Sequence, residues 1–228
     1  MREISENKPT PSSNVYLGDC IEGMKAFPDK QFDLALVDPP YGINAPNMAA
    51  TPCQRKNGNK RLNQGAGKLK GRILNQSNCD WDDSIPTEEY FTELFRVSKN
   101  QIIWGGNYFP LPPTRCIVVW DKVQPWENFS QVEIAWTSFD SPAQIYKFDN
   151  RTGDKIHPTQ KPIKLYEWLL NKYAKEGDKI LDTHLGSGSS RIAAYKGGFD
   201  FTAFEIDADY YAAQDNRFRN FKAQGRLW

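Results

Sequence analysis

Four consecutive residues, Asp38-Pro39-Pro40-Tyr41, combine a carboxylate, a corner without backbone donors and an aromatic ring. They follow an apolar run at 32–37, which is typical of a buried strand in a parallel sheet. The two prolines end that strand because they lack the N–H donors that a sheet ladder needs. The Asp38 carboxylate and the Pro39 carbonyl could accept the two protons of an exocyclic amino group, while the Tyr41 ring could stack on a planar heterocycle. The pattern therefore favours an aminated base as ligand, although Pro-Pro pairs also mark ordinary loops.

A second candidate site follows the apolar segment at 179–182, where a glycine-rich turn leads into a helix. Such a turn lets a ligand approach the backbone, and the N–H groups at the start of the helix point toward that ligand. The pattern is only Gly186-Ser187-Gly188, because Arg191 stands where the dinucleotide fingerprint has its third glycine. Glu205 ends the next predicted strand, about 20 residues on, where an acid binds ribose hydroxyls. These residues indicate an adenosine-type cofactor, with a solvated loop acid as the alternative for Glu205.

The elements that would position these residues alternate between strands and helices, which predicts an α/β fold with a mostly parallel sheet. Residues 132–136 alternate in polarity, so we expect them to pair antiparallel with the strand at 116–120 at a sheet edge. A polar tail at 1–14 precedes a single domain at 15–228, which is long enough for a full core. The predicted strands are 15–17, 32–37, 101–104, 116–120, 132–136, 179–182 and 199–205, and the predicted helices begin near residues 20, 87, 162, 189 and 209.

Composition excludes several classes of protein. No apolar stretch approaches the ~18 residues of a membrane span, and residues 1–14 lack the hydrophobic core of a signal sequence. The four cysteines are far apart, without a C-x-x-C pair, and the chain has two histidines, so we expect free thiols and no metal site. These features predict a cytoplasmic protein with neither a membrane nor a metal among its partners.

The formal net charge of +1 hides an uneven distribution. Residues 42–79 lack periodicity and acidic side chains, and the rest of the chain carries 22 basic against 28 acidic residues. A loop this long in a compact domain is either functional or disordered, and Lys and Arg side chains provide phosphate contacts to nucleic acids. The segment is therefore a candidate DNA-binding loop, with a solvated loop as the alternative. Its basic residues are Arg55, Lys56, Lys60, Arg61, Lys68, Lys70 and Arg72.

Four motifs, in the order in which they occur, resemble the amino-group (N6-adenine/N4-cytosine) DNA methyltransferases, which use S-adenosyl-L-methionine. The position of the catalytic motif before the cofactor motif is similar to the order in the β group of that family. The matches extend over nearly the whole domain. They are Gly18-Asp19-Cys20, Asp38-Pro39-Pro40-Tyr41, His157-Pro158-Thr159-Gln160-Lys161-Pro162 and Asp182-x-x-x-Gly186-Ser187-Gly188, followed by the strand-end acid Glu205.

The resemblance implies a circularly permuted Rossmann-like methyltransferase fold. Its sheet would have seven mostly parallel strands, one of them antiparallel, with helices on both faces. In the unpermuted order, the strands at 15–19, 179–182 and 199–205 would be the third, first and second. That arrangement would place Asp19, Asp38, Asp182 and Glu205 along one edge of the sheet.

The resemblance also implies a reaction, in which a methyl group passes from S-adenosyl-L-methionine to the N6 amino group of an adenine flipped out of double-stranded DNA. Asp at the first position of the catalytic motif favours adenine N6, whereas Ser favours cytosine N4. The implied roles are catalysis for Asp38, Pro39, Pro40 and Tyr41, and cofactor binding for Asp19, Lys161, Asp182, Gly186, Ser187, Gly188 and Glu205.

The sequence departs from the family pattern in two respects. Thr183, His184 and Ser189 replace the usual Pro, Phe and Thr of the cofactor turn, and His184 keeps a flat ring at its position. The target-recognition segment is also small, at about residues 138–156. We therefore expect the 42–79 loop to do much of the DNA reading, with a homodimer as one way to enlarge the surface.

Alternative functions remain open at this stage. An N4-cytosine methyltransferase and a catalytically inactive DNA-binding module are the main ones, and membership of a restriction–modification pair is undetermined. Pro52-Cys53-Gln54 resembles the nucleophile motif of cytosine-C5 methyltransferases, but it lies deep in the loop and in the wrong order. Enzymes that modify RNA or a protein glutamine usually carry Asn in place of Asp38. A nucleotide-dependent oxidoreductase would not explain the Asp-Pro-Pro-Tyr motif.

Overall fold

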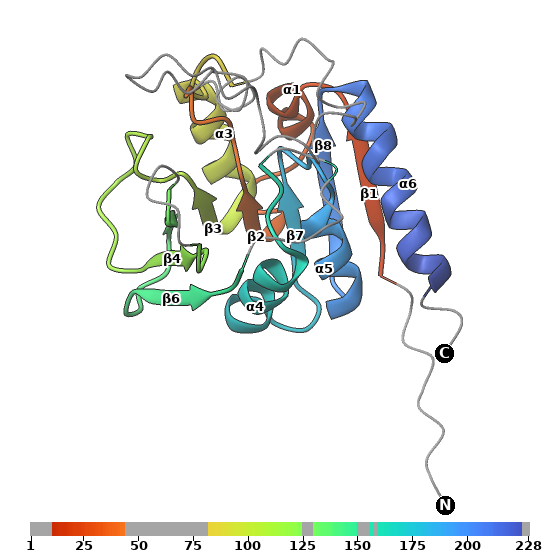
Figure 1. Ribbon diagram of the computed structural model, residues 1–228. Coiled ribbons are helices and arrows are strands. Elements are labelled where there is room, and N and C mark those ends of the chain that lie inside the picture. Colours follow the sequence, from red (N-terminus) through yellow and green to blue (C-terminus); the bar gives the residue numbers. More distant parts are fainter. Residues whose placement is uncertain (1–10, 44–81, 125–129, 150–155, 157–158, 225–228) are drawn as a thin grey trace, which may run out of the picture.

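The computed structural model of the protein describes residues 11–43, 82–124, 130–149, 156 and 159–224 (Figure 1). In these residues, one sheet of eight strands forms the centre of the molecule, and helices cover both of its faces. The strands are β1 (Ser13–Leu17), β2 (Phe32–Val37), β3 (Ser98–Trp104), β4 (Ile117–Asp121), β5 (Val132–Thr137), β6 (Gln144–Lys147), β7 (Lys179–Asp182) and β8 (Asp200–Glu205).

The order of the strands across the sheet is β1-β8-β7-β2-β3-β5-β4-β6. Strands β1, β8 and β7 lie next to one another and are parallel, as the permuted order of the family requires. Strand β5 is antiparallel to both of its neighbours, β3 and β4, and the other pairs are parallel, so one antiparallel strand is confirmed.

Two expectations about the sheet need correction. It has eight strands in the described residues instead of seven, because β6 pairs with β4 inside the segment expected to serve target recognition. For the same reason, the antiparallel pair of β4 and β5 does not form the sheet edge, where β6 lies instead. Residues 144–147 are a short, half-exposed run, and their sequence shows no strong strand pattern.

Helices α1 and α3 pack on one face of the sheet, while α4, α5 and α6 cover the other (Figure 1). Helix α6 packs beside α5, where the rings of Tyr195 and Phe218 are 5.4 Å apart. The described helices are α1 (Cys20–Lys25), α3 (Glu88–Val97), α4 (Ile163–Tyr173), α5 (Ser189–Gly197) and α6 (Ala208–Gln224).

Strand β2 shows why the apolar run at 32–37 forms a central strand. Leu34 and Leu36 join the hydrophobic cluster under α4 and α5, whereas Ala35 and Val37 join the cluster under α1 and α3. Because successive side chains point to opposite faces, a strand covered on both sides needs a continuous apolar run. This burial fixes the strand, and the chain leaves the sheet immediately afterwards at Asp38.

Most of the 42–79 segment lies outside the described residues, including all seven of its basic side chains and Cys53. The same holds for residues 1–10 and for His157 and Pro158 of the motif that precedes α4. None of the helices in the described part of the chain is both long and apolar enough to cross a membrane.

Candidate active site

Two cavities adjoin at the carboxyl ends of the central strands. One has a volume of about 390 Å³ and lies against the glycine-rich turn after β7, together with the residues that follow β1 and β8. The other has a volume of about 300 Å³ and lies over the ends of β3 and β5. In an open α/β sheet, this end of the strands is where ligands bind. The residues that line both cavities are Asp38, Pro40, Thr159 and Lys161.

The glycine-rich turn forms one wall of the larger cavity, to which Gly186 and Ser187 contribute. Gly186 and Gly188 have φ angles of 51° and 72°, a left-handed conformation that favours glycine. Asp182 lies beneath the turn and does not line the cavity. Its carboxylate accepts hydrogen bonds from the His184 N–H at 3.0 Å and the Ser190 hydroxyl at 2.5 Å. Burial raises the pKa of Asp182 to about 7, and the nearby carboxylates add to this rise.

Glu205 and Asp19 form the acidic side of the larger cavity. The Glu205 carboxylate accepts the Gly186 N–H at 2.7 Å on one oxygen and the Asp207 N–H at 3.0 Å on the other. Each oxygen of a carboxylate can accept two hydrogen bonds, so both retain a lone pair for a ligand. Asp19 caps α1 by accepting the N–H groups of Ile21 and Glu22.

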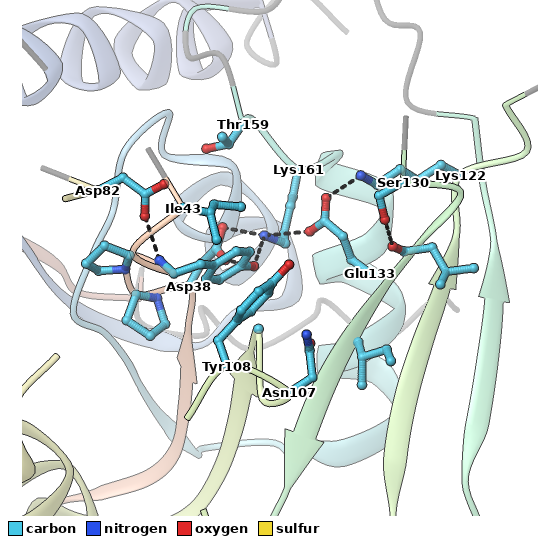
Figure 2. Close-up of a pocket in the computed structure, with 16 residues that line it drawn as sticks. Asp38, Ile43, Asp82, Asn107, Tyr108, Lys122, Ser130, Glu133, Thr159 and Lys161 are labelled. Atoms are coloured by element: carbon cyan, nitrogen blue, oxygen red, sulfur yellow. Dashed lines mark hydrogen bonds and ion pairs between the residues drawn. The ribbon is translucent and has the colours of Figure 1, made fainter. Parts of the chain in front are cut away.

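Asp38 lies at the point where the two cavities adjoin (Figure 2), and Tyr41 lines the smaller cavity beside it. The Tyr41 hydroxyl donates to Asp38 Oδ1 at 2.6 Å, and the Lys161 ammonium donates to Asp38 Oδ2. The Tyr41 ring is half-buried and stacks on Tyr108, with ring centroids 5.0 Å apart. Tyr108 is 43% exposed and lines the smaller cavity, so it extends the aromatic surface that the sequence assigns to Tyr41 alone.

Lys161 lies between two carboxylates. The family resemblance implies that this residue binds the cofactor. Its ammonium nitrogen is 3.2 Å from the Tyr41 hydroxyl and 3.0 Å from Glu133 Oε2. The Glu133 contact is an ion pair without hydrogen-bond alignment, because this buried oxygen has no hydrogen-bond partner in the described structure. Glu133 also forms an ion pair with Lys122, at 2.6 Å.

The charges in this cluster oppose the cost of burial. Burial raises the pKa of the Asp38 carboxyl, and Lys161 and the Tyr41 hydroxyl offset that rise only in part. Burial also acts against the charged form of Lys161, but the carboxylates of Asp38 and Glu133 keep its pKa above the usual value. Burial likewise opposes ionisation of Glu133, whereas Lys161 and Lys122 hold its pKa below the usual value.

Three residues of this region escape the sequence reasoning. Asp82 accepts the N–H groups of Tyr41 at 2.6 Å and Gly42 at 3.0 Å, and so holds the corner after β2. Tyr108 follows the double glycine after β3, which marks a loop but gives no direction for the ring. Glu133 sits inside an alternating strand, where a polar residue is usually solvated. No strand-end signal marks Asp82, which precedes the predicted helix near residue 87, whereas Glu133 is the second residue of the strand predicted at 132–136.

Comparison with known proteins finds similar sequences. A family model described as a DNA methylase matches residues 118–215, which include the glycine-rich turn and Glu205. Type II methyltransferase M2.MboI of Moraxella bovis is 23% identical over an alignment 246 residues long. The alignment covers 90% of this chain and 87% of that protein.

Solved structures share the fold. The PvuII DNA methyltransferase, described as cytosine-N4-specific, has a TM-score of 0.58 and 18% identity, with 92% of this chain and 87% of that chain covered. A DNA modification methylase of Thermus thermophilus, TTHA0409, solved in complex with S-adenosyl-L-methionine, has a TM-score of 0.56 and 17% identity, with 91% and 93% covered. The motif order, the sheet order and these similarities together support the resemblance to the amino-group DNA methyltransferase family.

Proposed function

We propose that this protein transfers a methyl group from S-adenosyl-L-methionine to the N6 amino group of an adenine that is flipped out of double-stranded DNA. The observation that carries the proposal is the junction of two cavities at the Asp38 corner. One cavity has the lining that an adenosine-type cofactor needs, and the other has the lining that a planar base needs. A transfer between two ligands requires their reacting atoms to meet, and the residues shared by both cavities surround that meeting point.

The residues of the larger cavity fit the cofactor. The remaining lone pairs of Glu205 suit the two hydroxyls of a ribose, and the glycine-rich turn brings its backbone close to the ligand. Asp19 and Ser187 lie in the same lining, while Asp182 and Gly188 shape the turn from outside it. The bound cofactor supplies an electrophilic methyl group.

The residues of the smaller cavity suit an aminated base. A carboxylate oxygen of Asp38 and the Pro39 carbonyl accept the two amino protons, which directs the nitrogen lone pair toward the neighbouring cavity. Tyr41 and Tyr108 offer their rings for stacking. Base pairing and stacking hide the amino group of an adenine in duplex DNA, so the base must leave the helix to reach this position. Asp38 is placed to accept the proton that the methylated nitrogen gives up.

A cytosine N4 amino group is the second candidate, because the PvuII enzyme with the same fold is described as cytosine-N4-specific. Both amino groups are exocyclic and planar with their ring, so the same acceptors could hold either. The preference for adenine rests on Asp38, since the first position of the motif in the cytosine enzymes favours Ser.

The direct test is to identify the methylated base. Plasmid DNA is incubated with the protein and S-adenosyl-L-methionine carrying an isotope-labelled methyl group, and the DNA is digested to nucleosides for mass spectrometry. We expect labelled N6-methyladenine from the wild-type protein and at least about a 100-fold lower rate from Asp38→Ala, because an amino-group acceptor is lost. Asp140→Asn serves as a control, since its side chain is exposed and pairs with Arg115 on the surface.

The other outcomes are equally informative. Labelled N4-methylcytosine would replace the adenine assignment with the cytosine one. A wild-type protein that binds both DNA and S-adenosyl-L-methionine but modifies no base would identify an inactive DNA-binding module. Activity of Asp38→Ala equal to that of the wild type would exclude the role given to the Asp38 corner.

A further inference from the structure

Lys161 is among the most buried charged side chains in the described structure, with 3% of its surface exposed. It immediately precedes Pro162 and α4, yet its ammonium group reaches the carboxyl end of β2, more than 100 residues earlier in the chain. Burying an unpaired ammonium group is costly, so its neighbours indicate what holds it there. Those neighbours are two carboxylates and a hydroxyl (Figure 2).

The directions around the ammonium group are taken up by this chain. A lysine has three N–H donors. One donates to Asp38 Oδ2 and one to the Tyr41 hydroxyl, while Glu133 Oε2 forms an ion pair at 3.0 Å. The rings of Trp104 and Tyr41 lie 5.2 Å and 5.6 Å from the nitrogen, within the range of cation–π contacts. A cofactor carboxylate would have to compete with the two carboxylates of this chain for the charge of Lys161.

We propose that Lys161 and Glu133 are positioning residues for the catalytic carboxylate, with Lys161 holding Asp38 and Glu133 anchoring Lys161. This inference rests on the proposed methyl transfer, and it gives Lys161 a role different from the cofactor contact that the family resemblance implies. Glu133 is central to this proposal, although none of the sequence motifs named above contains that residue.

The anchor is built from two adjacent strands. Glu133 lies on β5 and pairs across the ladder with Trp120 on β4, and Lys122 follows the end of β4. Lys122 contacts Glu133 at 2.6 Å, so positive and negative groups alternate from Lys122 through Glu133 and Lys161 to Asp38. Such a chain compensates its own buried charges, and it fixes each side chain through the next one.

The consequence for the reaction concerns the position and charge of Asp38. Lys161 holds one carboxylate oxygen and the Tyr41 hydroxyl holds the other, so the carboxylate cannot rotate. Each oxygen still has a lone pair for the amino group of the base. The ammonium group also favours the ionised carboxylate against the effect of burial. Without Glu133, Lys161 would be free to turn away from Asp38 into the larger cavity, which it also lines.

The test compares Glu133→Gln and Lys161→Met with a matched control, Glu167→Gln. Glu167 also pairs with two lysines, Lys164 and Lys196, and its side chain is 16% exposed, against 21% for Glu133. It lies on α4, outside the lining of both cavities. Circular dichroism and thermal melting establish that each variant is folded. Calorimetry then measures cofactor affinity, and single-turnover methylation measures the chemical step.

We expect the methyl-transfer rate to fall by about tenfold or more in Glu133→Gln, with the Kd for S-adenosyl-L-methionine within about twofold of wild type. Lys161→Met should behave in the same way, and Glu133→Asp should recover part of the rate. Glu167→Gln should match the wild type in both measurements. A rise of about tenfold or more in the cofactor Kd of Lys161→Met, with an unchanged rate in Glu133→Gln, would overturn the proposal and restore the cofactor role.

A second measurement needs no turnover and therefore separates this inference from the proposed function. The carboxyl ¹³C resonance of Asp38, assigned with Asp38→Asn, is titrated in the wild type and in the variants. Glu133 raises the pKa of Asp38 and Lys161 lowers it, and the other ionisable groups that interact with it are Tyr41, Tyr90, Tyr166 and Asp182. The pKa of Asp38 should rise in Lys161→Met, because the ammonium group is removed. It should also rise in Glu133→Gln, because Lys161 turns away from Asp38 and the larger effect of Lys161 is lost. A fall in Glu133→Gln would show that Lys161 stays on Asp38 without Glu133, and would refute the anchoring role. An unchanged pKa in both variants would refute the charge chain, even if the wild type transferred no methyl group.

Discussion

At the scale of single residues, Asp82 replaces a missing strand partner. Pro39 and Pro40 have no N–H groups, so the chain after β2 cannot be held by a sheet ladder. A single oxygen of Asp82, which is 1% exposed, accepts the N–H groups of both Tyr41 and Gly42. Two hydrogen bonds to one buried oxygen therefore set the direction of the corner.

His184 is the residue that departs most from the family pattern, and its ring belongs to a buried chain of hydrogen bonds. The Tyr90 hydroxyl is 2.7 Å from Thr183 Oγ1, which is 2.9 Å from His184 Nδ1. If Tyr90 donates to Thr183 and Thr183 donates to His184, both hydroxyl protons are used inside the protein. The His184 ring, which lines the larger cavity, then carries its proton on Nε2, where a phenylalanine would offer no donor.

The pH dependence of stability tests the state of His184. Burial lowers its pKa from 6.5 to about 4, partly offset by Asp19, so the folded protein binds fewer protons than the unfolded chain between these values. The contribution of the neutral His184 to the free energy of unfolding is therefore fully present above pH 6.5. It is lost as the pH falls toward 4. We expect urea unfolding of His184→Phe to lack this loss, which amounts to about 2 kcal/mol between pH 7.5 and pH 5.

Comparing the wild type with His184→Phe cancels the contribution of Asp182 to the pH dependence of stability, which has the opposite sign. Because its folded pKa is raised to about 7, Asp182 makes the protein less stable as the pH rises from about 4 to 7, in both the wild type and the variant. Parallel pH profiles for the two proteins would show that His184 is not held neutral.

At the scale of elements, the end of β3 determines where the Tyr41 ring lies. Gly105 follows this strand with a φ angle of 72°, and a Cβ atom there would lie 2.3 Å from Tyr41 Cε1. The close approach of backbone to ring explains why this position needs glycine. Gly177, between α4 and β7, also has a positive φ of 86° but has no atom within 4 Å of a Cβ.

These two glycines form a matched pair for mutation. Gly177→Ala should lose about 1 kcal/mol in the free energy of unfolding, because alanine is strained in the left-handed conformation. Gly105→Ala should lose more, because its Cβ also displaces the Tyr41 ring. Only Gly105→Ala displaces Tyr41, so only this variant should lose about tenfold or more in methyl-transfer rate. Denaturant unfolding and single-turnover kinetics measure the two effects. Equal rates in both variants would show that the ring position is not critical.

At the scale of the whole molecule, the order of the strands brings together residues that are far apart in the chain. Strand β2 pairs with β7 on one side and with β3 on the other, and β5 lies beyond β3. The Asp38 corner therefore has the glycine-rich turn on one side and Glu133 on the other. The same order separates the larger cavity from the smaller one, with the corner between them.

The two ends of the segment between Gly42 and Asp82 lie next to each other, because the Asp82 carboxylate accepts the Gly42 N–H. Residues 45–80 can therefore be replaced by a short Gly-Ser linker without separating the ends. We expect the shortened protein to lose DNA affinity, since the seven basic residues of this segment are removed, and to keep its affinity for S-adenosyl-L-methionine. Fluorescence anisotropy with duplex DNA and calorimetry with the cofactor measure the two affinities.

A matched variant separates charge from length in this experiment. Replacing the seven Lys and Arg residues by Gln keeps the full length of the segment. This variant should bind DNA more weakly, and its DNA affinity should depend less on the salt concentration. DNA affinity within about twofold of wild type in both proteins would contradict a DNA-reading role for the segment.

Much of this organisation was predictable from local patterns. The apolar runs that become β2, β7 and β8 are buried on both faces, and each ends in or directly before an acid, so strand positions and candidate acids followed from the sequence. The pairing of 132–136 with 116–120 was also predictable from alternation, and it is confirmed. Strand β6 was missed because its four residues are held by pairing with β4 and carry little propensity signal of their own.

The amino-acid sequence by itself determined the strand ends, the proline corner and the glycine-rich turn, because these depend on backbone geometry encoded by neighbouring residues. Only the tertiary structure decided that Lys161 meets Asp38, that Glu133 anchors Lys161 and that Asp82 holds the corner. These contacts join residues 28 to 123 positions apart. Their partners follow from the order of strands across the sheet, which a local pattern of side chains does not encode.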